Sequence, residues 1–74
     1  MTKLTKQVKE IVLKANKNLL FAQKHYLITL FNYKNKKERK MWGSIKSQHE
    51  DFLIYLSVQL GYNTLEELVI EAEK

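Results

Sequence analysis

The residue types that most often carry out chemistry in proteins are few in this chain and lie far apart. There are two histidines, His25 and His49, and no cysteine. No second imidazole or carboxylate lies three or four residues from His25, and the carboxylates next to His49 point to other faces of a helix. Neither histidine therefore has the spacing of a metal site or a general base. The serines lie outside any nucleophile-elbow motif. We expect a protein without enzyme activity, metal or cofactor.

Basic side chains around one tryptophan form the cluster that most clearly suggests a ligand. The cluster consists of Lys34, Lys36, Lys37, Arg39, Lys40, Trp42 and Lys46. Cations neutralise phosphates and release counterions, and an indole ring can stack on a base. The sequence therefore predicts a small accessory or regulatory protein that binds nucleic acid through these residues. The alternative is a solvated lysine-rich turn beside a tryptophan that belongs to the core.

Charge is distributed unequally along the chain. Residues 1–46 hold twelve of the 13 lysines and arginines and two of the eight acidic residues, a net charge of +10. Residues 47–74 hold one basic and six acidic residues, a net charge of −5. A field of one sign attracts partners of the opposite sign without selecting a particular one. An acidic protein is therefore the alternative partner, with the chain acting as an adaptor or inhibitor.

The length of 74 residues allows one domain, because a chain of this size has no material for a second core. A hydrophobic content of 45% is typical of a folded protein, and without cysteines no disulfide can stabilise it. The most apolar stretch, residues 19–33, is shorter than the about 20 residues that a membrane span needs. The N-terminus has no secretory signal, so we expect a cytoplasmic protein. Binding to an anionic membrane surface is a weaker alternative, because the apolar face of the first helix is needed for the core.

Helices are indicated along the whole chain. Proline is absent, and the apolar residues before position 34 recur every three or four positions, as a helix requires. Val12 widens this apolar series, which consists of Leu4, Val8, Ile11, Ala15, Leu19, Ala22, Tyr26, Leu30 and Tyr33. The sequence predicts one long N-terminal helix here. Residues 25–33 are also rich in residues that favour strands, so a strand there is an alternative.

A basic connector, residues 32–40, follows, in which Asn35 is expected to end the first helix. A second helical series then runs to Leu60 and consists of Met41, Trp42, Ile45, His49, Phe52, Leu53, Leu56 and Leu60. Gly61 separates it from a short third helix, residues 65–73. Ser47 with Glu50 and Thr64 with Glu67 have the form of capping boxes, so they mark two helix starts. The predicted fold is all-α and a single domain, residues 1–74, with a long N-terminal helix, an antiparallel second helix and a short C-terminal helix.

The first capping box leaves open whether residues 39–46 are helical or extended. If the segment is extended, residues 39–74 resemble the ribbon-helix-helix DNA-binding proteins. The resemblance lies in the order of a strand, a helix, the tripeptide Leu60-Gly61-Tyr62 and a second helix. In that family the strands of a dimer enter the major groove, so the resemblance implies that Trp42, Ser44 and Lys46 face DNA. Gly43 within the strand and the helical arm before it depart from the family pattern.

A second apolar seam lies on the lysine-rich side of the first helix. Leu13, Leu20 and Leu27 are seven residues apart, and Phe31 continues the seam. The helix that covers the first series cannot also cover this one, so either the third helix or another subunit must lie there. The sequence predicts a homodimer, a helical bundle made of two hairpins, with Leu13, Leu20, Leu27 and Phe31 at the interface.

Overall fold

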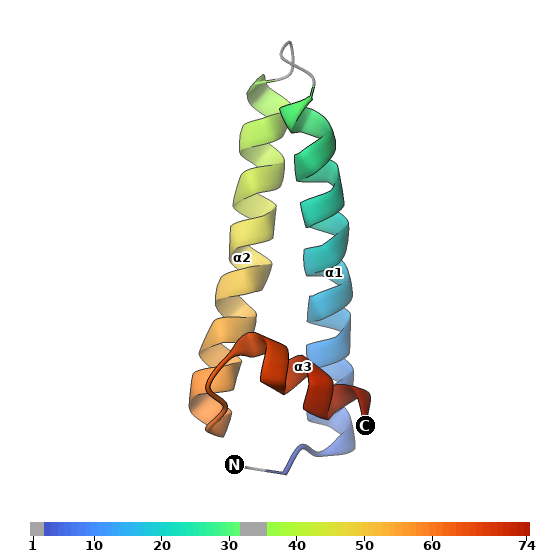
Figure 1. Cartoon of the computed structure of the whole chain (residues 1–74), viewed down its shortest axis with the longest axis vertical. Helices are drawn as coiled ribbons and strands as arrows, with labels where there is room; N and C mark the ends of the chain where they lie inside the picture. Colours follow the sequence, from blue (N-terminus) through green and yellow to red (C-terminus); the bar gives the residue numbers. More distant parts are fainter. Residues whose placement is uncertain (1–2, 32–35) are drawn as a thin grey trace.

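Three helices make up the computed structural model, which describes residues 3–31 and 36–74. They are α1 (Lys6–Leu30), α2 (Lys36–Leu60) and α3 (Leu65–Glu73), and no strand occurs in these two ranges. Figure 1 shows α1 and α2 as an antiparallel hairpin, with α3 lying across the end where both termini are found. The molecule is elongated, with extents of 46 × 18 × 15 Å. The predicted order and packing of the helices is confirmed.

The N-terminal ends of α1 and α3 are capped by threonines. The Thr5 hydroxyl accepts a hydrogen bond from the Val8 N–H, at 3.2 Å. The Thr64 hydroxyl accepts one from the Glu67 N–H, also at 3.2 Å, and the Glu67 carboxylate accepts the N–H of Asn63. The predicted capping box at Thr64 is therefore confirmed, except that the Glu67 carboxylate accepts the N–H of Asn63 and not that of Thr64 itself. Each cap satisfies an N–H that has no partner within the helix.

The predicted start of the second helix at Ser47 is wrong. Ser47 lies in the middle of α2, and Glu50 forms an ion pair with Lys46, at 3.3 Å, instead of closing a cap. Part of the expected connector is also helical, because α2 begins at Lys36. Asn35 and the rest of the connector, residues 32–35, lie outside the described residues. The local capping signal was overridden because the helical series extends on both sides of Ser47 and no proline interrupts it.

Residues 39–46 are helical, so the strand on which the ribbon-helix-helix resemblance depended is absent. Gly43 is instead a helical residue at the contact with α1. A Cβ atom added there would lie 3.2 Å from Cε2 of Tyr26, which is tighter than ordinary contact. The glycine therefore allows the two helices to approach each other closely. The strand alternative for the first helix also fails, since α1 is helical through Leu30.

The end of α2 is a left-handed glycine turn that redirects the chain into α3. Gly61 has a φ of 83°, the Tyr62 N–H donates to the Ser57 carbonyl at 2.8 Å, and the Gly61 N–H donates to the Val58 carbonyl at 3.2 Å. This pair of bonds is a Schellman motif, which satisfies carbonyls that the helix leaves without partners. Tyr62, the next residue, is buried with 6% of its surface exposed. The turn thus starts the path by which α3 folds back onto the hairpin.

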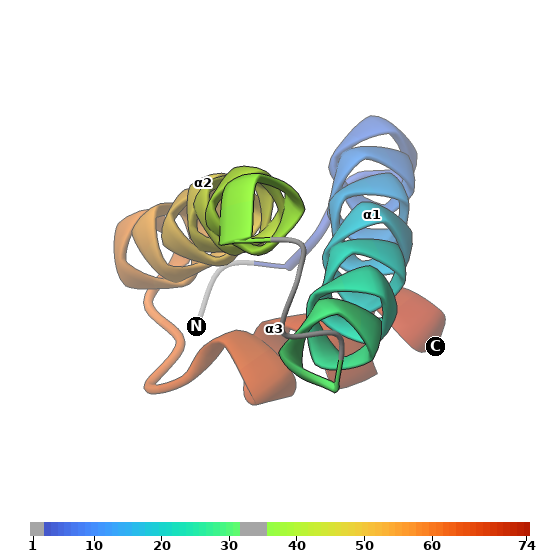
Figure 2. The same ribbon diagram turned by 90° about the horizontal axis from the view of Figure 1, so that it is seen from above.

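The main hydrophobic cluster lies where α3 crosses the hairpin, and farther along α1 only Ala22 and Thr29 are buried among the described residues. Figure 2 shows that α3 covers one face of the hairpin. Leu53, Leu68 and Val12, one from each helix, have no exposed surface. The remaining buried members of the cluster are Leu4, Ala15, Leu19, Tyr62, Val69 and Ala72. In the half of the hairpin nearer the connector, α2 has no fully buried side chain.

The position of α3 also explains where the predicted apolar face of α1 is wrong. Ile11 and Leu30 were expected to be buried but are 50% and 39% exposed, whereas Val12 and Thr29 are buried. Near the N-terminus, α3 packs on the side of α1 that carries Val12 and leaves Ile11 uncovered. Leu30 projects on the same side as Val12, at about 100° per residue, but lies beyond the reach of α3. Thr29 is accommodated because its hydroxyl donates to the Tyr26 carbonyl, at 2.7 Å.

We predict that Leu53→Ala lowers the free energy of unfolding by about 2–5 kcal/mol, because it opens a cavity where all three helices meet. Ile54→Ala, on the neighbouring and 43% exposed residue, is the matched control and is expected to cost less than about 1 kcal/mol. Urea unfolding followed by circular dichroism measures both. Equal effects of the two substitutions would contradict the placement of the core.

We predict that Gly61→Ala lowers the free energy of unfolding by about 1–2 kcal/mol, because an alanine at positive φ is strained. Gly61→Asn should cost less, since asparagine tolerates this conformation better than other residues with a side chain. Thermal unfolding of both variants tests the turn. If alanine and asparagine are equally well tolerated, the Schellman motif is not needed for the α2–α3 connection.

Candidate interaction surface

The predicted nucleic-acid-binding residues do not form one surface. Lys36, Lys37 and Lys40 are exposed on the first turns of α2. Arg39 is half-buried, and its Nε is buried without a hydrogen-bond partner among the described residues. Lys46 is held in its ion pair with Glu50. Lys34 lies outside the described residues. Three lysines of the cluster thus remain together as an open basic patch.

Trp42 packs against the first helix. Its ring is stacked on that of His25, with centroids 4.6 Å apart and planes at 17°. Phe21 meets the edge of the same tryptophan at 5.8 Å and lies 4.3 Å from His25. The half-buried Trp42 therefore helps to join α1 and α2 where α3 is absent, and the ring face that stacks on His25 is closed to a base.

The second apolar seam is open in the single chain. Leu20 and Leu27 are 56% and 55% exposed, Phe31 is 84% exposed, and Leu13 is at 37%. The third helix packs elsewhere on α1, against the core that contains Val12 and Leu19. The sequence allowed either the third helix or another subunit to cover this seam. The structure excludes the third helix.

Lysines alternate with this seam on the same face of α1. We define the Lys/Leu stripe as Lys6, Lys9, Leu13, Lys17, Leu20, Lys24, Leu27 and Phe31. Its members are three or four residues apart and project about 150° from the buried face, at about 100° per residue. The sequence predicted the leucines and Phe31 as an interface that did not include the lysines between them. The three- and four-residue spacing that joins the lysines to the leucines is present in the sequence itself.

The positive charge of the stripe is not neutralised within the described chain. The ion pairs there are Lys46 with Glu50 and Lys74 with Glu71, so no lysine of α1 takes part in one. The first turn of α1 contains no acidic residue, and Lys6 and Lys9 lie at the positive end of its dipole. Such placement disfavours the helix slightly. The lysines are therefore not explained by the stability of α1.

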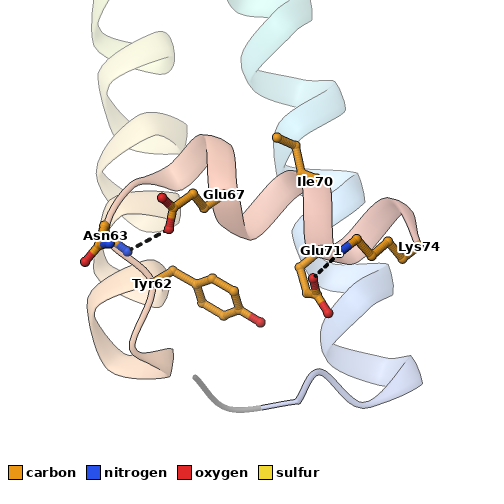
Figure 3. A pocket seen from close by; sticks show the side chains of 6 residues that line it. All are labelled: Tyr62, Asn63, Glu67, Ile70, Glu71 and Lys74. Carbon is orange, nitrogen blue, oxygen red and sulfur yellow. Dashed lines mark hydrogen bonds and ion pairs between the residues drawn. The ribbon is translucent and has the colours of Figure 1, made fainter.

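A shallow pocket of 260 Å³ lies beside α3, in the acidic C-terminal part of the chain. Figure 3 shows its lining residues, Tyr62, Asn63, Glu67, Ile70, Glu71 and Lys74. Its carboxylates are already engaged, since Glu67 accepts the Asn63 N–H and Glu71 pairs with Lys74 at 3.1 Å. Burial, followed by the charge of Glu71, raises the pKa of Tyr62. The pocket is thus a packed junction of the fold, with little free charge for a ligand.

Within residues 3–31 and 36–74, no group of three histidine or acidic side chains is close enough to hold a metal ion. The same part of the chain has no helix whose length and apolar character would let it cross a membrane. No protein family, curated protein or solved structure matches this chain.

Proposed function

We propose that this chain is a non-enzymatic protein-binding module, an adaptor or inhibitor, and that the Lys/Leu stripe of α1 docks on an acidic and partly apolar protein surface. The observation that carries the proposal is the alternation of unpaired lysines with exposed Leu20, Leu27 and Phe31 on one helix face. The cytoplasmic location predicted from the sequence stays a prediction.

The apolar members of the stripe favour a protein partner over nucleic acid. Exposed leucine and phenylalanine side chains at helical spacing are typical of surfaces that bury an apolar partner face. A phosphate backbone offers them no such face. Phe31, the most exposed large apolar residue in the described chain, lies at the end of the stripe and can fill a pocket as an anchor residue.

The lysines favour an acidic partner. Lys6 and Lys9, three residues apart, repel each other by a few tenths of a kcal/mol, and Lys17 and Lys24 extend the positive field of the same face. Carboxylates on the partner would remove this repulsion and speed the encounter. Lys17 and Lys24 are each flanked by leucines of the seam, so they would contact the partner together with the apolar residues.

The predicted nucleic-acid function retains a smaller surface, namely Lys36, Lys37 and Lys40. Their exposure supports electrostatic binding, but Trp42 is packed against His25. This hypothesis stays a prediction, and the experiment below separates it from the protein-binding proposal.

The predicted homodimer through Leu13, Leu20, Leu27 and Phe31 also stays a prediction, and the lysines weigh against it. Two parallel copies would place Lys17 opposite Lys17. Two antiparallel copies centred on Leu20 would place Lys17 within about one residue of Lys24. Like charges brought together at an interface are unfavourable, so the stripe fits an acidic partner better than itself.

Partner capture from a nuclease-treated cell extract, with the tagged chain as bait, tests the proposed function. We predict that the double variants Lys17→Glu with Lys24→Glu, and Leu20→Ser with Leu27→Ser, each reduce capture of the same protein by about tenfold or more. All four residues are exposed, so circular dichroism should show an unchanged fold.

The double variant Lys36→Glu with Lys37→Glu is the matched control, because it removes the same amount of basic charge from another helix. It should leave capture unchanged. Capture that occurs only from an untreated extract, and that this control variant loses, would replace the proposal with nucleic-acid binding. Capture that survives both stripe variants would reject the Lys/Leu stripe as the binding face. If the chain captures no protein but binds anionic lipid vesicles, the stripe would be assigned to a membrane surface.

A further inference from the structure

We infer that a second copy of this chain packs against an uncharged stripe of α2, in antiparallel orientation. The neutral stripe consists of Met41, Ile45, Gln48, Phe52, Tyr55 and Gln59. Its members are three or four residues apart and project about 140° from the buried Leu53 and Ser57, at about 100° per residue. It is a different surface, on a different helix, from the Lys/Leu stripe.

Except for the half-buried Ile45, the neutral stripe is exposed in the single chain. Met41 is 48%, Phe52 42% and Tyr55 61% exposed, although the first two belong to the apolar series that predicted this helix. The groove beside it is lined by Ile11, Lys14, Ala15, Asn18, His49 and Phe52 and contains no residue of α3. A partner helix that lies along the stripe would therefore meet no obstacle from the rest of the fold.

The absence of charge selects a second copy as the occupant. From Met41 to Leu60 the charged residues are Lys46, Glu50 and Asp51. Lys46 and Glu50 project to the opposite side of α2, and Asp51 lies at the edge of the stripe, about 40° from Tyr55. A two-fold symmetric contact brings each residue type near itself, which is unfavourable for charges and harmless for glutamine, methionine and aromatic side chains. The neutral stripe is thus self-complementary in a way that the Lys/Leu stripe is not.

The charges at the two ends of α2 select the antiparallel orientation. The first turn of α2 contains Lys36 and Lys37, which oppose the helix dipole and outnumber Glu38 in the same turn, and the last turn contains no basic residue. In an antiparallel pair centred on Gln48, Lys37 of one copy lies beside Gln59 and the negative carbonyl end of α2 in the other. A parallel pair would place all of these lysines at one end.

The size of the stripe indicates a weak, concentration-dependent dimer. Residues 41–59 span about 27 Å of helix at 1.5 Å per residue, so one helix pair buries less than the about 800 Å² per partner of a typical stable interface. Reversible dimerisation is therefore the expected behaviour, and it would present two Lys/Leu stripes to a partner.

Sedimentation equilibrium over a wide range of concentrations tests the dimer. The wild-type mass should rise from 8.8 kDa toward twice that value. Phe52→Glu with Tyr55→Glu should raise the dimer dissociation constant at least about tenfold. Val58→Glu is the matched control, because Val58 is 66% exposed on the same helix but outside the stripe. A wild-type chain that remains monomeric up to millimolar concentration, or an equal effect of the control, would overturn the proposal.

Oxidative cross-linking tests the orientation. Because the chain has no native cysteine, only the introduced cysteines can form a disulfide. In the antiparallel pair, Gln48→Cys lies near the two-fold axis and should form a disulfide-linked dimer, whereas Gln59→Cys should not cross-link to itself. Efficient self-cross-linking at both positions would show a parallel pair and reject the inferred arrangement. Leu20→Ser with Leu27→Ser should leave dimerisation unchanged. This result distinguishes the neutral stripe from the Lys/Leu stripe, whatever the outcome of partner capture.

Discussion

The packing of α3 across the open end of the hairpin is the interaction on which the rest of the structure depends. Two antiparallel helices alone can bury only one face each, and a chain of this length has little apolar surface to remove from water. By covering one face near the termini, α3 encloses Val12, Leu53 and Leu68 completely. The glycine turn at Gly61 makes this return possible within a few residues. The main hydrophobic cluster is therefore local to one end of the molecule.

The same arrangement explains why so much apolar surface is left uncovered. Beyond the reach of α3, the hairpin is joined by close contacts at Gly43 and Tyr26 and by the rings of Phe21, His25 and Trp42. These contacts fill the space between the helices but not their outer faces. Because the outer faces of α1 and α2 differ in charge, we propose different occupants for them: an acidic protein for the lysine-bearing face and a second copy for the neutral one.

Much of the fold was predictable because its signals are local. The 3.6-residue periodicity identified the helical segments, and the Thr64 cap and Gly61 marked the third helix and the turn before it. The errors arose where a local signal competes with a longer pattern. Ser47 and Glu50 have capping-box spacing, yet the helix continues through them. The candidate site was less predictable, since whether Trp42 is free or packed depends on His25, a residue on another helix.

The sequence by itself determined that the chain is helical, that its halves carry opposite charge, and that α1 has a second apolar seam, because these properties depend on residue type and spacing alone. Only the tertiary structure decided which seam remains exposed. The position of α3 buries Val12 and leaves Ile11, Leu20 and Leu27 in solvent, and it does so through contacts between residues more than 40 positions apart. Periodicity describes the faces that a helix has, whereas burial depends on which neighbour each face meets.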